Sequence, residues 1–211
     1  MTPDSPLPLF STAYFPSILY MAHLCRYAKV GIEVMETFPK QTFRNRTVIA
    51  TGNGLQTLTV PVVRTQGNQT RTEEIGISYN EPWNVRHWRA IVSAYNAAPY
   101  FLYYRDEIEH VLMQQYERLI DLNDDLLGLL LKNMKIACTP VHTQDFTPPL
   151  SQDNDHRHTL TAKHFVTNCQ FPPYYQTFDT RYGFQPNLSV LDLLFNLGPD
   201  AKGYLLQLNI T

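Results

Sequence analysis

The spacing of apolar residues at the start of the chain predicts a strand, a loop and a helix. Residues 7–16 form the expected opening strand and the loop that ends it. Apolar residues then recur at helical spacing over 17–30, with Ser17 as the expected N-cap. The next segment, 31–36, predicts a second strand. This order is typical of α/β folds, in which ligands bind at the carboxyl ends of the strands.

The middle of the chain is rich in β-forming residues. Segments 42–50, 56–63 and 73–79 predict strands, and the sequence TGNG at 51–54 predicts a turn between the first two. Pro61 is expected at an edge or a strand end, because proline cannot donate a ladder hydrogen bond.

Helical spacing dominates the second half of the chain. The predicted helices cover 81–98, 186–199 and, as one or two helices, 100–135. Asn123 and Asn187 are the expected caps, and 136–141 predicts a strand that returns to the sheet. Residues 140–187 show no sustained periodicity, which predicts a long irregular loop.

Composition agrees with one folded domain. The chain has 211 residues, of which 44% are hydrophobic and 17% charged, enough for one sizeable core. We therefore predict a single α/β domain over 1–211, with a mixed sheet, an N-terminal strand–loop–helix unit, a β-rich middle and a C-terminal helical half.

The charge balance and the distribution of cysteines restrict the partners and the compartment. With 17 Lys and Arg against 19 Asp and Glu, the chain has no bulk positive charge for nucleic acid. The N-terminus lacks a signal-peptide pattern, and the longest strongly apolar stretch, 126–131, is too short to span a membrane. The three cysteines form no CxxC pair. We expect a cytoplasmic protein without a transmembrane segment.

The segment KQTFRNR concentrates positive charge. Strand alternation would place Arg44 and Arg46 on one face, where two guanidinium groups form a clamp for phosphate or carboxylate, with Lys40 nearby. The alternative is a solvated edge whose cations pair with Glu33 and Glu36.

His87 is the main candidate for acid–base chemistry. On the predicted helix it shares a face with Trp83, Ile91 and Ala94, in the amino-terminal half. Burial and the positive helix end would both keep the imidazole neutral, as a general base requires. A core histidine bonded to backbone is an equally good interpretation.

Other polar groups give weaker signals. His142, His156, His158 and His164 lack the spacing of metal sites, so we expect no metal, and no standard nucleotide or hydrolase fingerprint predicts a cofactor. Asp192 lies among leucines of the last predicted helix, where it either locks that segment to an Arg or His or faces a ligand. The structural lock is favoured.

Several separated motifs, in order, resemble the WbqC-like protein family, especially its shorter, Bacteroidetes-type forms. These motifs are AYFPSILYMAHL, EVMETFPKQTFRNRTVIATGNGLQTLTVPV, WNVRHWRAIVSAYNAAPYFLYY, LIDLNDDLL and NLSVLDLLFNLGP. Many longer relatives carry His-Gln-Pro-Asn before the Tyr-Phe-Pro core. This chain has LFSTAYFP there and lacks that His and Gln.

The resemblance implies a transferase of bacterial surface-polysaccharide (O-antigen-like) biosynthesis, with glycine transfer among the suggested activities. Its partners would be a small anionic activated donor and a glycan precursor. His87 and Glu36 are the candidate catalytic residues. The candidate substrate-binding residues are Tyr14, Lys40, Gln41, Arg44, Asn45, Arg46, Asn53, Trp83 and Trp88.

Two other functions remain open. The first is a non-catalytic protein of the same pathway that binds an anion or nucleotide sugar or assists assembly. The second, ranked low, is a nucleotidylyltransferase-like enzyme, which rests on analogy of fold alone.

Overall fold

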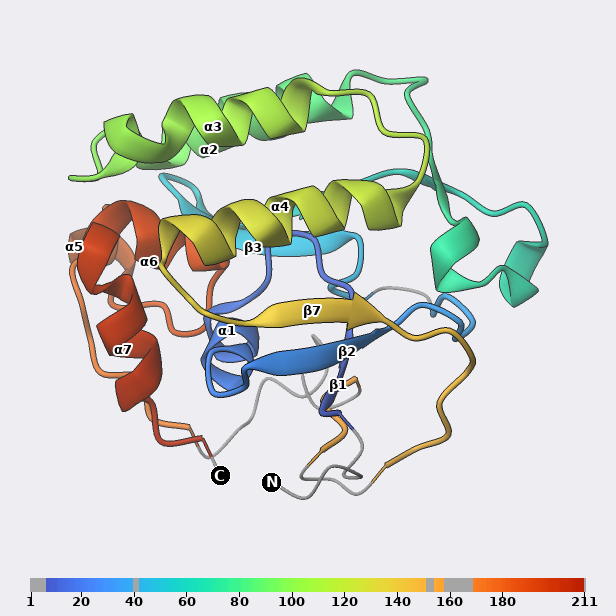
Figure 1. The fold of residues 1–211 in the computed structure, drawn as a ribbon. Coiled ribbons are helices and arrows are strands. Elements are labelled where there is room, and N and C mark those ends of the chain that lie inside the picture. The colour runs from blue at the N-terminus through green and yellow to red at the C-terminus, as the bar shows by residue number, and fades with distance from the viewer. Residues whose placement is uncertain (1–6, 40–41, 151–153, 158–168, 211) are drawn as a thin grey trace.

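The structure, a computed structural model, describes residues 7–39, 42–150, 154–157 and 169–210 (Figure 1). The strands are β1 (Leu9–Ser11), β2 (Lys29–Glu33), β3 (Arg46–Thr51), β4 (Gly54–Thr59), β5 (Val62–Val63), β6 (Gly76–Ile77) and β7 (Thr139–His142). The α-helices are α1 (Ile18–Leu24), α2 (Trp83–Tyr95), α3 (Phe101–Met113), α4 (Leu119–Asn133), α5 (Asp179–Tyr182), α6 (Val190–Leu197) and α7 (Ala201–Gln207).

The described strands form three small sheets. A parallel sheet has the order β1-β2-β7, and β3–β4 and β5–β6 are antiparallel pairs. The predicted α/β class with a helical second half is confirmed, and the parallel and antiparallel strands expected in a mixed sheet lie in separate small sheets. In the parallel sheet Ser11 pairs with Glu33 and Ile32 with His142, so the carboxyl ends of the three strands meet at one edge.

The predicted strands of the middle segment are shorter in the structure. β3 begins at Arg46, because residues 43–45 form a turn. Pro61 falls between β4 and β5 and divides the segment predicted as one strand. Over 73–79 only Gly76–Ile77 is a strand, because a 3-10 turn at Thr72–Glu74 precedes it. The TGNG hairpin turn is present, with Thr51 paired to Gly54.

The opening helix is confirmed but shorter than predicted. Ser17 is its N-cap, and the Ser17 hydroxyl accepts a hydrogen bond from the Tyr20 N–H at 3.2 Å. The helix ends at Leu24, and Lys29 already belongs to β2.

Both asparagines predicted as caps have other roles. Asn123 lies inside α4, where its buried amide donates to the hydroxyl of Thr12 and to the carbonyl of Arg44. Asn187 caps α1, since its Oδ1 accepts from the Leu19 N–H at 2.9 Å. The N-cap of α6 is Ser189, whose hydroxyl accepts from the N–H of Leu191.

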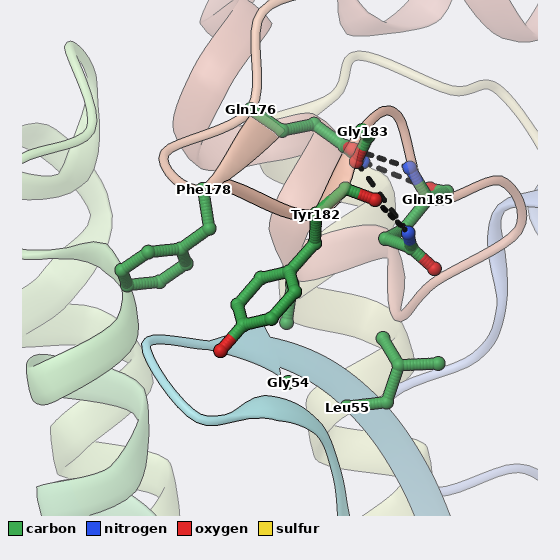
Figure 2. Close-up of a pocket in the computed structure, with 8 residues that line it drawn as sticks. Gly54, Leu55, Gln176, Phe178, Tyr182, Gly183 and Gln185 are labelled. Carbon is green, nitrogen blue, oxygen red and sulfur yellow. Dashed lines mark hydrogen bonds between the residues drawn. The ribbon is translucent and has the colours of Figure 1, made fainter. Parts of the chain in front are cut away.

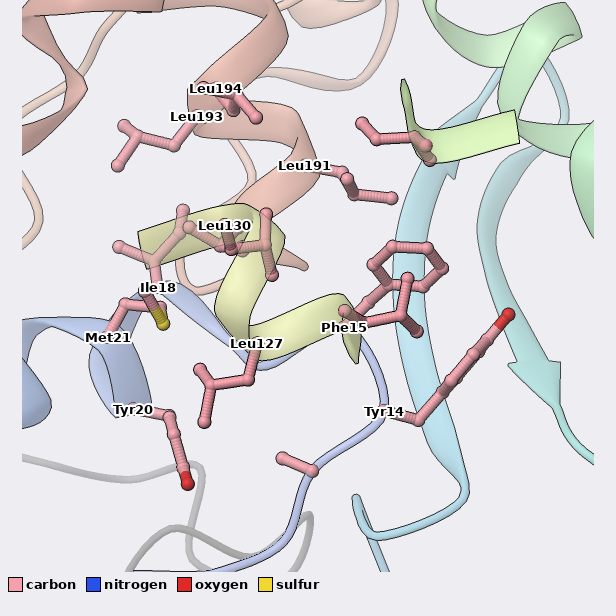
Figure 3. Close-up of a cluster of buried hydrophobic side chains, with 14 of the residues drawn as sticks. Tyr14, Phe15, Ile18, Tyr20, Met21, Leu127, Leu130, Leu191, Leu193 and Leu194 are labelled. Atoms are coloured by element: carbon pink, nitrogen blue, oxygen red, sulfur yellow. The ribbon is translucent and has the colours of Figure 1, made fainter. Parts of the chain in front are cut away.

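The hydrophobic core joins segments that are far apart in sequence. Figure 3 shows Tyr14, Phe15 and Ile18 from the opening segment against Leu127 of α4 and Leu191 of α6. α2 packs on α3, and α3 on α4 (Figure 1). α7, which the sequence analysis did not predict, packs against α1. No helix in the described part of the chain combines the length and apolar character needed to cross a lipid bilayer.

The contact between the start of α6 and α1 can be tested at Asn187, whose side chain accepts from the N–H of Leu19. Its φ is +52°, a left-handed conformation that Asn and Gly tolerate. We expect Asn187→Gly, which loses the cap, to lower the free energy of unfolding by about 0.5–1 kcal/mol, and Asn187→Ala, which adds strain, by about 1–2 kcal/mol. Urea denaturation measures both. Equal stability of both variants and the wild type would contradict the capping role.

Candidate functional site

The loop after β1 holds the first residue of the candidate site. Tyr14 is fully buried, and its N–H donates to the carbonyl of Phe43 at 3.0 Å. Phe15 has a φ of +42°, which is strained for an aromatic residue. The Phe15 carbonyl accepts from the Thr47 hydroxyl at 2.7 Å and the Ser189 hydroxyl at 3.4 Å. These bonds from β3 and the start of α6 hold the strained loop in place.

The Tyr14 side chain meets His87 of α2. The Tyr14 hydroxyl lies 2.9 Å from Nδ1 of His87, and the imidazole also hydrogen-bonds the Thr59 carbonyl. A carbonyl can only accept, so the ring nitrogen that faces Thr59 must carry the proton. Since Tyr14 lies at Nδ1, we assign the proton to Nε2 and the acceptor role to Nδ1. Burial lowers the pKa of His87 to about 4, although the bond to Thr59 opposes the shift. The imidazole is therefore neutral at pH 7.

A cavity of about 400 Å³ opens beside His87. Its lining includes Thr59, Ser78, Asn80, Trp83, Arg86 and His87. This volume lies within the roughly 300–1,000 Å³ typical of small-molecule sites. Trp83 is 4% exposed, and its Nε1 has no hydrogen-bond partner among the described residues. A buried polar atom without a protein partner is commonly satisfied by an ordered water or a bound ion.

Arg44 is not part of an open clamp. It is 2% exposed, lies in the turn before β3, and donates from Nε and Nη2 to the Glu36 carboxylate, the former at 3.0 Å. Because Arg44 lies outside β3, the alternation of side chains along the strand does not place Arg44 and Arg46 on one face, as was predicted. The expected pairing with Glu36 exists, but inside the protein, where an ion pair fixes local structure.

Arg46 lies closer to the His87 cavity. As the first residue of β3 it pairs with Thr59, which both lines the cavity and accepts from His87. Its Nε is buried and has no partner within the part of the chain that the structure describes. Arg46 is thus linked to the His87 cavity through its strand partner Thr59.

The remaining predicted residues are more dispersed. Asn45 is buried and donates to the Val60 carbonyl at 2.8 Å, and Trp88 stacks on Phe101 with ring centroids 6.2 Å apart. Asn53 is exposed in the hairpin turn. The predictions for residues 40 and 41, Lys40 and Gln41, lie outside the described residues.

Sequence reasoning missed a buried charge cluster at the carboxyl edge of the parallel sheet. Glu33 is fully buried at the end of β2, and Nη1 of Arg157 lies 3.6 Å from its carboxylate. Arg157 also binds Asp155 through Nε at 2.9 Å and Nη2 at 2.6 Å. Burial opposes ionisation of Asp155, but the bonds from Arg157 and Leu150 lower its pKa to about 2. The available signal was Glu33 itself, a charged residue inside the predicted strand 31–36.

Asp192 forms a structural lock, but not with the partners expected. Its carboxylate accepts from the Tyr174 hydroxyl at 2.6 Å and the Gln176 amide at 2.8 Å, and neither partner is an Arg or His. Burial raises its pKa to about 6, although these hydrogen bonds lower it. The lock holds the segment before α5 against α6.

Metal binding has no support among the described residues. No group of three or more His, Cys, Asp or Glu side chains there is arranged to hold a metal ion. His142 instead pairs with Asp124 at 2.8 Å, which raises the His142 pKa. His158 and His164 lie outside the described residues.

The chain belongs to the WbqC-like protein family, whose model matches residues 12–168. Uncharacterized protein Rv1507c of Mycobacterium tuberculosis (strain ATCC 25618 / H37Rv) is 28% identical over 193 residues, 80% of this chain and 83% of that protein. No solved structure matches the chain. The matched range includes Tyr14, Arg46 and His87, and ends before Asp192.

The Glu36–Arg44 pair can be tested by removing one charge or both. We expect Arg44→Met to lower the free energy of unfolding by about 3–5 kcal/mol, because a buried carboxylate is left unpaired. The double variant Glu36→Gln/Arg44→Met should recover most of that loss. Arg118→Met, in an exposed pair with Asp121, is the control and should cost under about 1 kcal/mol in urea denaturation. A loss for Arg44→Met no larger than the control's would contradict burial of the pair.

The lowered pKa of His87 predicts acid sensitivity. Between pH 6.5 and about 4 the unfolded chain binds a proton that folded His87 does not, so stability falls as the pH falls. At about 1.4 kcal/mol per pKa unit, the contribution is at most about 3.5 kcal/mol. His87→Gln should reduce the difference between the free energies of unfolding measured in urea at pH 7 and at pH 4.5. Asp192, whose pKa is raised, makes the fold more stable as the pH falls. It does so in the wild type and in His87→Gln alike, so its effect cancels when the two proteins are compared. An unchanged difference would contradict the neutral buried state.

Proposed function

We propose that this protein is a transferase of bacterial surface-polysaccharide biosynthesis. It takes an anionic activated donor, aminoacyl (glycine) or sugar, and a glycan precursor as acceptor. The observation that carries the proposal is the cavity of about 400 Å³ with His87, the hydrogen-bond partner of Tyr14, at its wall. Membership of the WbqC-like family supports the proposed pathway, because the resemblance to that family implies surface-polysaccharide biosynthesis.

Two donors that are unpaired within the described part of the chain, one on the lining residue Trp83 and one on Arg46, the strand partner of Thr59, favour an acceptor-rich, anionic ligand. Trp83 Nε1 and Arg46 Nε are both buried donors without partners among the described residues. Phosphate, carboxylate and sugar hydroxyl oxygens satisfy such donors, and a guanidinium also neutralises charge. Arg46 would stabilise the negative charge that develops on the leaving group. Lys40 and Gln41 would add to this binding.

The reaction would proceed by general base catalysis at His87. The acceptor hydroxyl or amine would replace the Tyr14 hydroxyl at Nδ1, the one unprotonated ring nitrogen, and transfer its proton there as it attacks the donor carbon. The bond from that carbon to the anionic leaving group would break in the same step. Trp83 would shape the cavity. Glu36 would act through Arg44, by fixing the turn that precedes Arg46.

One observation favours the non-catalytic alternative. Both nitrogens of His87 already have protein partners, Tyr14 and the Thr59 carbonyl. A histidine bonded in this way also serves a purely structural role. Under this alternative the same cavity binds an anion or nucleotide sugar without turnover.

Substitution at His87 separates the two functions. Glutamine has one acceptor and two donors, so His87→Gln can keep both hydrogen bonds but cannot accept a proton. Under the transferase proposal, turnover in a panel of nucleotide sugars and aminoacyl donors should fall about 100-fold or more, with binding retained. Wild-type binding without turnover across the panel would support the alternative.

Arg46 is tested with inorganic diphosphate as the probe. Arg46→Ala should weaken binding about tenfold, since a charge-assisted contact to the anion is lost. Arg89→Ala is the matched control, because Arg89 is exposed on the same helix as His87 and does not line the cavity. Equal thermal stabilisation of wild type and Arg46→Ala by diphosphate would contradict the anion site.

A further inference from the structure

A second cavity, of about 160 Å³, lies between the β3–β4 hairpin and the segment around α5. Figure 2 shows Phe178, Tyr182 and Gln185 reaching from that segment toward the hairpin, with Gly54 and Leu55 opposite. The volume is below the roughly 300 Å³ of a complete small-molecule site, so it suits one part of a larger ligand. The 176–185 side of this cavity lies outside the range matched by the family model.

The walls of the second cavity are preorganised. Tyr182 Oη and Arg181 Nη1 donate to the carbonyl of Gly52 at 2.8 and 2.5 Å, which fastens α5 to the hairpin turn. Gln176, at the other end of the segment, is held by Asp192. Because both ends are fixed, the Phe178 ring and the face of the Tyr182 ring that the Arg181 guanidinium does not cover form apolar walls for a flat ring.

Gln185 supplies one acceptor of fixed orientation. Its Nε2 donates to the carbonyls of Tyr182 at 3.0 Å and Gly183 at 3.4 Å. A carbonyl cannot donate, so the amide cannot be reversed and Oε1 must face away from the two carbonyls. A flat ring that reaches Oε1 would therefore be recognised through an N–H donor of its own.

Residues of the two cavities share one face of the hairpin. Strand register places the side chains of Ala50 and Leu55, at the second cavity, on the same face as those of Arg46 and Thr59. Leu55 and Thr59 are four residues apart on β4, or about 14 Å. A ribose and two phosphates joined end to end have a comparable reach.

We propose that the second cavity binds the nucleobase, of pyrimidine size, of a nucleotide-activated donor. The base lies between the walls formed by Phe178 and Tyr182 and donates an N–H to Gln185. The phosphates follow β4 to Arg46, and the transferred group reaches the cavity at His87. This assignment rests on the proposed function, in which Arg46 holds the anion. Among the activated donors proposed above, it favours those that carry a nucleotide.

The experiment compares uridine 5′-monophosphate with ribose 5-phosphate, which lacks the base, by isothermal titration calorimetry. The nucleotide should bind wild type at least about fivefold more tightly, as stacking of one base on an aromatic ring provides. Phe178→Leu keeps apolar bulk without the ring, and Leu55→Trp fills the cavity from an exposed position. Both variants should lose the preference for the nucleotide.

Tyr175→Leu is the matched control, because Tyr175 is an exposed aromatic of the same segment that does not line the cavity. It should keep the preference. Equal binding of the two ligands by wild type, or a preference that survives in both Phe178→Leu and Leu55→Trp, would overturn the proposal. Arg46→Ala should weaken both ligands equally. If Arg46→Ala weakens the binding of neither ligand while the preference for the nucleotide remains, the anion site of the proposed function is contradicted. The nucleobase site is then still supported.

Discussion

The hydrogen bond between Tyr14 and His87 is the constraint on which the candidate site depends. It joins the loop after β1 to α2, two segments 73 positions apart in the chain. The bond forms because the strained Phe15 backbone is held by Thr47 and Ser189. It also fixes the imidazole as a neutral group at the wall of a cavity. One short loop thus links the parallel sheet, the hairpin and the helices.

Buried ion pairs determine which cations remain for a ligand. Glu36 binds Arg44, and Glu33 and Asp155 bind Arg157, all with little exposure to solvent. Such pairs contribute more to specific local structure than to net stability. They hold the segments around the carboxyl edge of the parallel sheet, where α/β proteins commonly bind ligands. Arg46, with a buried and unpaired Nε, is then the described cation of the basic segment best suited to an anion.

The order of elements could be predicted from the sequence, because apolar periodicity and turn signals are local. The opening strand–loop–helix, the TGNG hairpin and the returning strand at 139–142 all follow from such patterns. Cap assignments failed where the partner is distant: Asn187 caps α1, 168 positions away along the chain. Arg44 was predicted on a strand face, but burial beside Glu36 depends on tertiary packing that alternation does not contain.

Only part of the candidate site could be predicted from the sequence. His87 and Tyr14 come together in space, as a shared pocket requires, whereas the second cavity had no sequence signal because each of its walls is unremarkable alone. The cavity exists only because Asp192 and Gly52 anchor the 176–185 segment over the hairpin.

The most direct test of the central claim is ¹⁵N NMR of the His87 imidazole, assigned by comparison with His87→Gln. The account predicts a neutral ring at pH 7 with the proton on Nε2, and a change at Nδ1 when an anionic donor enters the cavity. A protonated ring at pH 7, or a proton on Nδ1, would contradict it.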